Sequence, residues 1–183
     1  ENIGGSWVQL GQTIVGEASS DNSSESGIEL SDNGYTVAIP ALYNDGNGPS
    51  SGHVRVYNYN GSSWTQLGQD IDGESSDDHS GYSVSLSSDG NTVAIGAIDN
   101  DGNGNSSGHA RIFNYNGSSW TQLGQDIDGE VANDQSGISV SMSGDGNIIA
   151  IGAKYNDGNG FGSGHVRINQ NVAGSWSQLG QDI

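Results

Sequence analysis

Residues 82–125, YSVSLSSDGNTVAIGAIDNDGNGNSSGHARIFNYNGSSWTQLGQ, contain one complete structural unit of this 183-residue sequence. Tyr82–Leu86 and His109–Tyr115 alternate in polarity, which is typical of strands with one buried face. Thr92–Ala97 is mostly apolar and predicts a central strand buried on both faces. Ser119–Gln125 predicts a fourth strand, and no segment shows the period of an amphipathic helix.

The connections between these segments carry turn residues. Ser88–Asn91 (SDGN) predicts a tight turn between the first two strands. Asp99–Gly108 is a polar loop rich in Gly, Asn and Asp, and Asn116-Gly117 is a strong hairpin signal. The unit therefore predicts a four-stranded antiparallel sheet.

The same unit recurs along the chain. SWTQLGQDIDGE stands unchanged at Ser63–Glu74 and Ser119–Glu130, and SWSQLGQDI ends the sequence at Ser175–Ile183. The four Trp residues lie 57, 56 and 56 positions apart. We divide the single repeat domain, 1–183, into repeats at about 6–62, 63–118 and 119–174, with a partial repeat at 175–183.

Four short strands in each of three repeats of about 56 residues predict an all-β fold, a β-propeller-like array of four-stranded antiparallel blades. A parallel β-solenoid is the alternative, although its coils are usually shorter and lack such hairpins. Closed propellers have about four to eight blades, so three blades leave open edges. We therefore expect self-association or a longer parent chain.

Composition excludes several classes of protein. The formal net charge of −18 repels phosphate backbones and anionic lipid, so we expect no nucleic-acid partner and no membrane insertion. Hydrophobic residues make up 31% and there are 31 glycines, which excludes a large helical core. Cysteine is absent, which excludes disulfides and thiolate sites. The sequence starts at Glu1 without a signal-peptide pattern, which favours a mature form or a fragment.

Short motifs in the repeats resemble a known family. They are Gly81-Tyr82-Ser83-Val84, Ala94-Ile95-Gly96-Ala97 and Gly108–Phe113, with Gly137-Ile138-Ser139-Val140, Ala150-Ile151-Gly152-Ala153 and Gly164–Ile168 in the third repeat and degenerate copies at Gly27–Leu30 and Ala38–Ala41. These motifs are similar to the FG-GAP repeat, which builds the propeller of integrin α subunits and of many secreted microbial and algal proteins. The resemblance implies an extracellular, secreted or cell-surface setting.

Members of that family often carry a DxDxDG calcium loop between the first two strands of a blade. Here that connection is Ser87–Asn91, which is too short for such a loop. Calcium at the family position is therefore not expected.

A different loop offers calcium ligands. Asn-Asp-Gly-Asn-Gly recurs between the second and third strands, and alternate oxygens on a tight glycine turn suit Ca²⁺. No Glu follows at EF-hand spacing, and the alternative is a loop stabilised by Asx-type hydrogen bonds. The candidate metal ligands are Asp45, Asn47, Asp99, Asp101, Asn103, Asp157 and Asn159.

Three of the four basic residues stand at one repeat position, two residues after a His. Residues i and i+2 of a strand share a face, so each pair could bind an anion or a sugar acid. The alternative is a structural ion pair between each Arg and a carboxylate. The candidate ligand-binding residues are His53, Arg55, His109, Arg111, His165 and Arg167.

Asp70–Glu74 (DIDGE) and its copy Asp126–Glu130 are acidic stretches that we interpret as solvated loops, with a second cation site as the alternative. The repeated Trp is interpreted as a packing anchor between blades rather than as a sugar-stacking surface. Candidate N-glycosylation sequons stand at Asn22, Asn60, Asn105 and Asn116.

No nucleophile elbow, HExxH motif or phosphate loop is present, and no carboxylate pair differs from its copies. We therefore expect no enzyme but an extracellular binding, adhesion or structural repeat module that presents copies of one surface. The alternatives are a self-assembling filament or surface-layer subunit joined through open blade edges, and a calcium-dependent carbohydrate-binding propeller. Expected partners are glycans or extracellular proteins.

Overall fold

The computed structural model describes all residues from 1 to 183 and contains strands, turns and loops but no helix. Each of its three main sheets is antiparallel and contains a path of four consecutive strands, and a fifth, two-residue strand joins each of the first two of these sheets. The predicted all-β, propeller-like array is therefore confirmed. No helix is present that would have the length and apolar character needed to cross a membrane.

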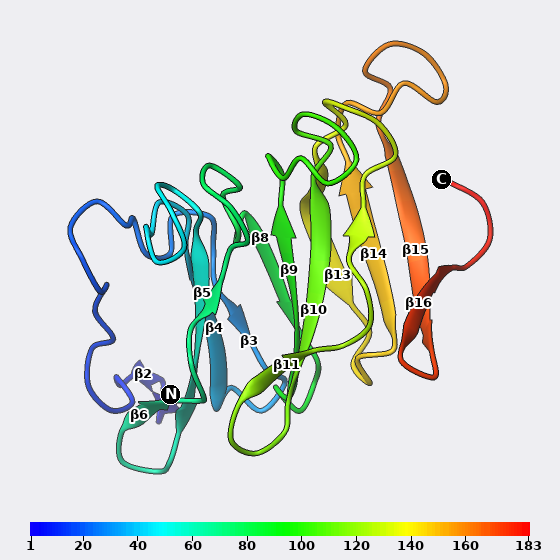
Figure 1. Ribbon diagram of the computed structural model, residues 1–183. Helices are drawn as coiled ribbons and strands as arrows, with labels where there is room; N and C mark the ends of the chain where they lie inside the picture. Colours follow the sequence, from blue (N-terminus) through cyan, green and yellow to red (C-terminus); the bar gives the residue numbers. More distant parts are fainter.

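We call the three sheets blade 1, blade 2 and blade 3 in chain order (Figure 1). Blade 1 contains β3 (Glu29–Leu30), β4 (Thr36–Ala41), β5 (His53–Tyr59) and β6 (Trp64–Gln66); blade 2 contains β8 (Ser83–Leu86), β9 (Thr92–Ala97), β10 (His109–Tyr115) and β11 (Trp120–Gln122); blade 3 contains β13 (Ser136–Met142), β14 (Ile148–Ala153), β15 (His165–Val172) and β16 (Ser175–Gln178). The four segments predicted in residues 82–125 match the strands of blade 2 within a few residues.

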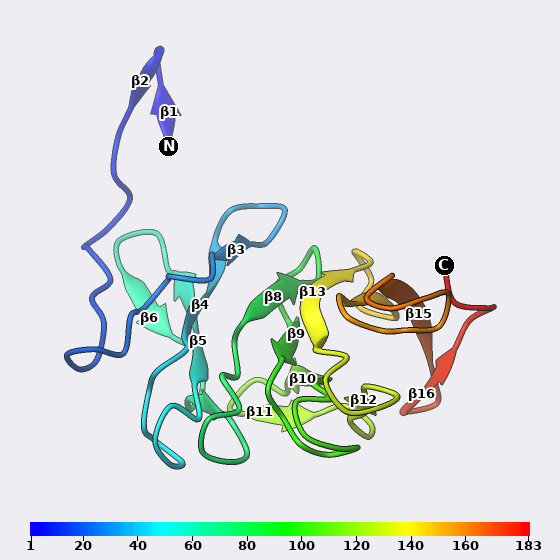
Figure 2. The same cartoon turned by 90° about the horizontal axis from the view of Figure 1, so that it is seen from above.

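The blades follow one another side by side in chain order, as Figure 2 shows from above. A small hairpin of β1 (Asn2–Ile3) and β2 (Ser6–Trp7) stands away from them. Trp7 in this hairpin is 83% exposed, unlike its buried counterparts Trp120 and Trp176.

The prediction of a solvated loop over Asp70–Glu74 and Asp126–Glu130 is wrong at the centre of each stretch. Ile71–Asp72 forms β7, which pairs with β5, and Ile127–Asp128 forms β12, which pairs with β10. Ile71 is buried and keeps only 3% of its surface exposed. A single apolar residue between carboxylates is too short a pattern to predict a strand, so tertiary packing decides the outcome here.

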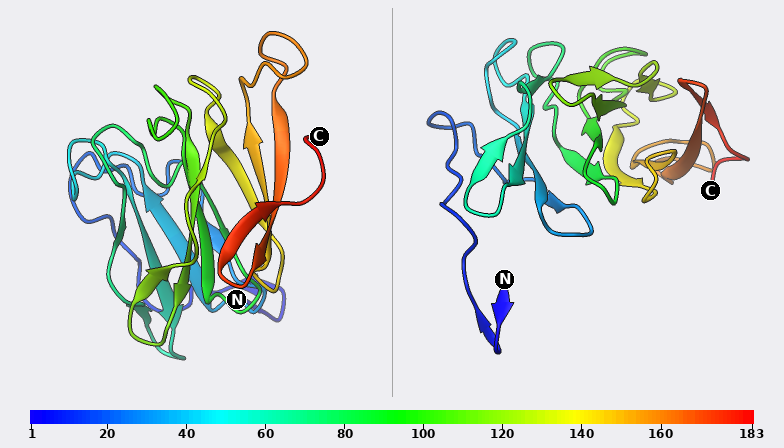
Figure 3. Two further views of the ribbon diagram at one scale, coloured as in Figure 1. Left: turned by 45° about the vertical axis from the view of Figure 1, so that its right-hand side comes forward. Right: turned by 90° about the horizontal axis from the view of Figure 1, so that it is seen from below.

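The core of the molecule lies between the blades. One apolar cluster joins Val54 and Val56 of blade 1 to Val93 and Ile95 of blade 2. A second joins Ile112 of blade 2 to residues of blade 3. Because β9 contributes Ala94 to one cluster and Val93 and Ile95 to the other, it is buried on both faces, as its sequence predicts. Figure 3 shows this succession of sheets from two further sides.

A repeated clamp fastens the outer strand of each blade to the chain before it. The Gln69 side chain makes two hydrogen bonds to the backbone of Trp120. Gln69 Nε2 donates to the Trp120 carbonyl at 2.9 Å, and the Trp120 N–H donates to Gln69 Oε1 at 3.2 Å. The Trp120 indole N–H donates to the Leu67 carbonyl at 2.8 Å. Equivalent bonds join Gln12 to Trp64 and Gln125 to Trp176. The interpretation of these three Trp residues as packing anchors therefore agrees with their contacts.

Close backbone approach explains two glycines of the repeat motif. A Cβ on Gly96 would lie 2.1 Å from the Gly137 carbonyl oxygen of the next blade. Gly137 itself has φ +88°, and a Cβ there would lie 2.3 Å from the His109 carbonyl oxygen. Only glycine fits both positions without movement of the backbone.

Candidate functional site

The His and Arg residues of the repeat lie between each blade and the chain that precedes it. His53 and His109 are each 1% exposed, and Arg55 and Arg111 are also buried. Each Arg reaches back to a carbonyl about 40 residues earlier: Arg111 donates to Asp72 O at 2.7 Å, and Arg55 to Val15 O at 3.3 Å. Arg167 makes the same bond to Asp128. The guanidinium groups are thus engaged in structural contacts, and anion binding at these pairs stays a prediction.

Each His of the repeated His and Arg pairs faces two carboxylates, a grouping that the sequence analysis did not predict. We call these groups site 1, site 2 and site 3. In each, one His nitrogen and two carboxylate oxygens lie within 4.8 Å of one another. Their members are Glu17, His53 and Asp70; Glu74, His109 and Asp126; and Glu130, His165 and Asp182.

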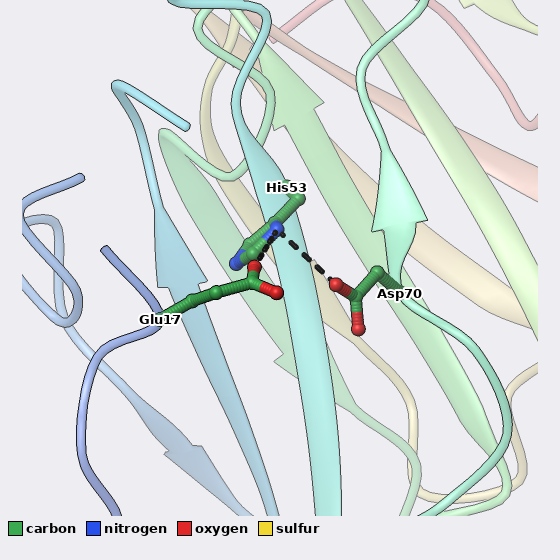
Figure 4. Close-up of side chains that lie close together, drawn as sticks. All are labelled: Glu17, His53 and Asp70. Carbon is green, nitrogen blue, oxygen red and sulfur yellow. Dashed lines mark ion pairs between the residues drawn. The ribbon is translucent and has the colours of Figure 1, made fainter. Parts of the chain in front are cut away.

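Site 1 shows the geometry of the group (Figure 4). His53 Nδ1 lies 3.9 Å from Glu17 Oε2 and 3.7 Å from Asp70 Oδ2. The His comes from β5, the Asp from the segment after β6, and the Glu from the chain that leads into blade 1. Site 3 repeats these distances, with His165 Nδ1 at 3.8 Å from Glu130 and 3.9 Å from Asp182.

Burial controls the charge state of these groups. Burial lowers the pKa of His53, although the carboxylate of Asp70 opposes the shift. Burial, together with the nearby Arg111 guanidinium, lowers the pKa of His109 to about 4. Both imidazoles are therefore neutral near pH 7. Burial also raises the pKa of the Glu74 carboxyl, and Arg111 opposes that shift.

The loops predicted to bind calcium use many of their polar groups internally. Asp45 Oδ1 accepts the Ser50 N–H at 2.8 Å, and Asp101 Oδ1 accepts the Ser106 N–H at 2.8 Å. Asn103 Nδ2 donates to the Gly129 carbonyl, and Asn47 makes the same contact to Gly73. Asp157 Oδ1 accepts the Gly162 N–H at 2.6 Å, and the backbone N–H of Asn159 donates to Ser163 Oγ at 3.3 Å. These contacts match the alternative of an Asx-stabilised loop, and calcium binding there stays a prediction.

Asp99, the remaining predicted calcium ligand, contacts a histidine. Its Oδ2 is 2.8 Å from His79 Nδ1, a direct contact between one carboxylate and one imidazole. The predicted glycosylation residues Asn22, Asn60, Asn105 and Asn116 are all exposed. Asn60 and Asn116 occupy equivalent hairpin turns, where each Oδ1 accepts two backbone N–H groups.

The blades, their repeated motifs and their repeated sites define a repeat protein of the β-propeller class. Residues 70–113 and 127–168 each match the family model described as "FG-GAP repeat". These segments are therefore FG-GAP repeats, and the predicted FG-GAP-type family is confirmed. No curated protein gave a significant match.

Solved structures share the fold at low sequence identity. A candidate 6-phosphogluconolactonase from Bacteroides fragilis has a TM-score of 0.58 and 12% identity, over 85% of this chain and 38% of that chain. One from Bacteroides uniformis has a TM-score of 0.56 and 15% identity, over 86% and 39%. Hydrazine synthase of Kuenenia stuttgartiensis has a TM-score of 0.51 and 10% identity, over 82% and 34%. The chain thus spans less than two fifths of each of these proteins, and the likeness shows the fold alone.

One signal in the sequence could have revealed the three sites. Each Asp follows its His by 17 positions, and each His follows its Glu by 35 or 36 positions. Asp70 and Glu74 belong to an acidic stretch of the sequence, and the His of each site belongs to a repeated His and Arg pair. The connection between the two sets depends on which blade faces which segment, and only the structure gives that.

Proposed function

We propose that this chain is an extracellular, non-enzymatic repeat module that works by binding. The observation that carries the proposal is the equivalence of its blades: blades 1 to 3 carry the same NDGNG loop and the same His and Arg pair, which is buried in blades 1 and 2 and partly exposed in blade 3. An active site normally distinguishes one position from its copies, since acid and base roles need groups with different pKa values. Repetition of one surface suits adhesion or the recognition of a repeated ligand.

The experiment must separate binding from catalysis. We would assay the purified chain for hydrolysis of 6-phosphogluconolactone, the activity for which two structural neighbours are named. The proposal predicts no turnover above the uncatalysed rate. Hydrolysis that is lost on substitution of one Asp or Glu would overturn it.

The binding partner would be sought in parallel on arrays of glycans and extracellular proteins, with and without calcium. Capture of a defined glycan or protein supports a binding module, and calcium-dependent capture of glycans would assign the lectin alternative. Arrays that stay blank in both conditions would count against the proposal. Detection of the native protein in the cytoplasm rather than in the medium or at the cell surface would contradict the extracellular part.

A second candidate function, self-assembly through blade faces, has its own observation. Leu30 on β3 is 52% exposed, whereas the equivalent Leu86 in blade 2 is 6% exposed because blade 1 covers it. Around Leu30 lies an apolar hollow of about 380 Å³ on the outer face of blade 1, lined among others by Leu10, Ile14, Ile28 and Trp64. We propose that a blade of a second copy covers this face, as blade 1 covers blade 2.

A further inference from the structure

We propose that sites 1, 2 and 3 each bind one divalent transition-metal ion of the zinc class, and that the ion links the segment entering a blade to two positions within that blade. The three residues of each site differ from the predicted calcium ligands, although the first Asn of two NDGNG loops, Asn44 and Asn156, donates to Glu17 Oε2 and Glu130 Oε2. The sites also lie away from the Ser87–Asn91 turn, which connects the first two strands of blade 2.

Two of the three sites hold a buried imidazole with an unpartnered ring nitrogen. His53 is 1% exposed and neither of its ring nitrogens has a hydrogen-bond partner. His109 is equally buried and its Nδ1 has no partner. A buried polar atom without a partner costs about 1–3 kcal/mol, so the repetition of this arrangement calls for a ligand.

The spacing between the His nitrogens and the carboxylate oxygens suits a bound metal ion. The His nitrogens lie 3.7–3.9 Å from the carboxylate oxygens in sites 1 and 3, which is too long for a hydrogen bond. Zn²⁺ binds nitrogen and oxygen ligands at about 2.0–2.2 Å, so two ligands of a tetrahedral ion lie roughly 3.3–3.6 Å apart. The observed spacing needs only a small inward movement of flexible carboxylates to close around an ion.

Glutamine side chains orient the Asp carboxylate of each site. Gln122 Nε2 donates to Asp126 Oδ1 at 2.6 Å, and Gln178 makes the same bond to Asp182 at 2.7 Å. Gln66 does so for Asp70 in site 1. In sites 1 and 3 it is the other oxygen, Oδ2, that approaches the His. Such outer contacts are the usual support of metal ligands.

The negative charge of the sites and their exposure to solvent also suit a cation. Two carboxylates and one imidazole match a doubly charged ion, and an imidazole ligand favours zinc-class ions over Ca²⁺ or Mg²⁺. Arg111 lies 3.5 Å from Glu74 Oε1, but Oε2 of the same carboxylate faces His109. The Glu17 side chain is 50% exposed, and a pocket of about 380 Å³ reaches His165 and Asp182, so ions can enter from solvent.

The test measures how much zinc the chain binds. The full chain, freed of metal with a chelator, would be titrated with ZnCl₂ near neutral pH by calorimetry, and bound metal would be counted by mass spectrometry. We expect three zinc ions per chain, one for each site, with no displacement by millimolar Ca²⁺. Less than one ion per chain, or complete displacement by Ca²⁺, would overturn the proposal.

Variants locate the ions. His109→Gln should reduce the number of bound ions to two, and Asp126→Asn should weaken binding of one ion about tenfold or more. Asp126→Asn keeps an oxygen for Gln122 and is only partly buried, so it tests site 2 even if His109→Gln does not fold. His79→Gln is the matched control, since His79 contacts the single carboxylate of Asp99, and it should leave three ions bound. Unchanged binding in both site 2 variants would overturn the proposal.

Discussion

Two glycines with nearly the same backbone angle φ show how a single backbone contact restricts which residue a position accepts in this fold. Gly137 has φ +88° and Gly174 has φ +87°, so any side chain is unfavourable at both positions. The two differ in their surroundings: the His109 carbonyl crowds Gly137, whereas nothing lies within 4 Å of a Cβ at Gly174.

This pair gives the first prediction. Gly174→Ala should lower the free energy of unfolding by about 1–2 kcal/mol, the cost of a left-handed backbone for alanine. Gly137→Ala should cost about 1–3 kcal/mol more, because the added methyl group must displace backbone between blades 2 and 3. Urea unfolding of the two variants measures the difference. Equal losses would show that the close approach of the blades is not a constraint.

The turn before β9 depends on one carboxylate. Asp89 Oδ1 accepts hydrogen bonds from Ser87 Oγ at 2.7 Å and from the Asn91 N–H at 3.0 Å. The N–H of Asn91 is the main cause of a lowered pKa of Asp89, supported by Ser87. In blade 1, Asn33 occupies the same position and its Oδ1 accepts the corresponding two bonds.

The second prediction follows from this internal comparison. Asp89→Ala should cost about 1 kcal/mol, whereas Asp89→Asn should cost less, because an amide oxygen can accept the same bonds. Since folding lowers the pKa of Asp89, its contribution is present above the usual value of 3.8 and is lost as the pH falls below it. The difference in unfolding free energy between wild type and Asp89→Asn should therefore shrink in acid. A difference that does not change between pH 7 and pH 3 would contradict this assignment.

At the scale of the element, the strands could be predicted where sequence pattern and turn signals agree. The apolar run of β9 and the alternation of β10 predict both strands with their observed bounds. β7 and β12 could not be predicted, because two residues carry no period and their pairing with β5 and β10 is a tertiary contact. Sites 1 to 3 could be predicted only in part for the same reason. Their His and acidic residues stand out in the sequence, but which of them lie together depends on how each blade packs against the preceding segment.

The Gln clamp between blades gives the third prediction. Gln69→Ala removes two hydrogen bonds to the backbone of Trp120 and should cost about 1–2 kcal/mol. It should also speed hydrogen exchange at the Trp120 amide. Gln9→Ala serves as the control, since Gln9 is exposed and makes only long bonds of 3.4 Å. If both variants exchange and unfold like the wild type, the clamp does not hold the blades together.

At the scale of the whole molecule, consecutive blades cover one another, and within residues 1–183 no blade covers the outer face of blade 1. The exposed Leu30 marks this difference, because each equivalent residue further along the chain packs against the preceding blade. If a second copy covers this face, a charge placed there should prevent association while leaving the interior of each blade intact.

The fourth prediction tests that face. Leu30→Asp should remove self-association, because it introduces a charge into the apolar hollow around Ile28 and Trp64. Val131→Asp is the matched control, since Val131 is 55% exposed but lies on the loop before blade 3. Sedimentation velocity of both variants gives the comparison. Loss of association in the control as well would point to general charge repulsion rather than to this face.

The central claim about the whole molecule is that the open face of blade 1 docks a second copy, and the solution mass of the chain tests it most directly. Light scattering across a concentration series should give a species of twice the 18.8 kDa chain mass, as expected if two copies cover each other's open blade faces. Larger, open-ended species would assign the filament form of the same association. A single species of one chain mass at every concentration would contradict the claim that blade 1 offers a docking face to a second copy.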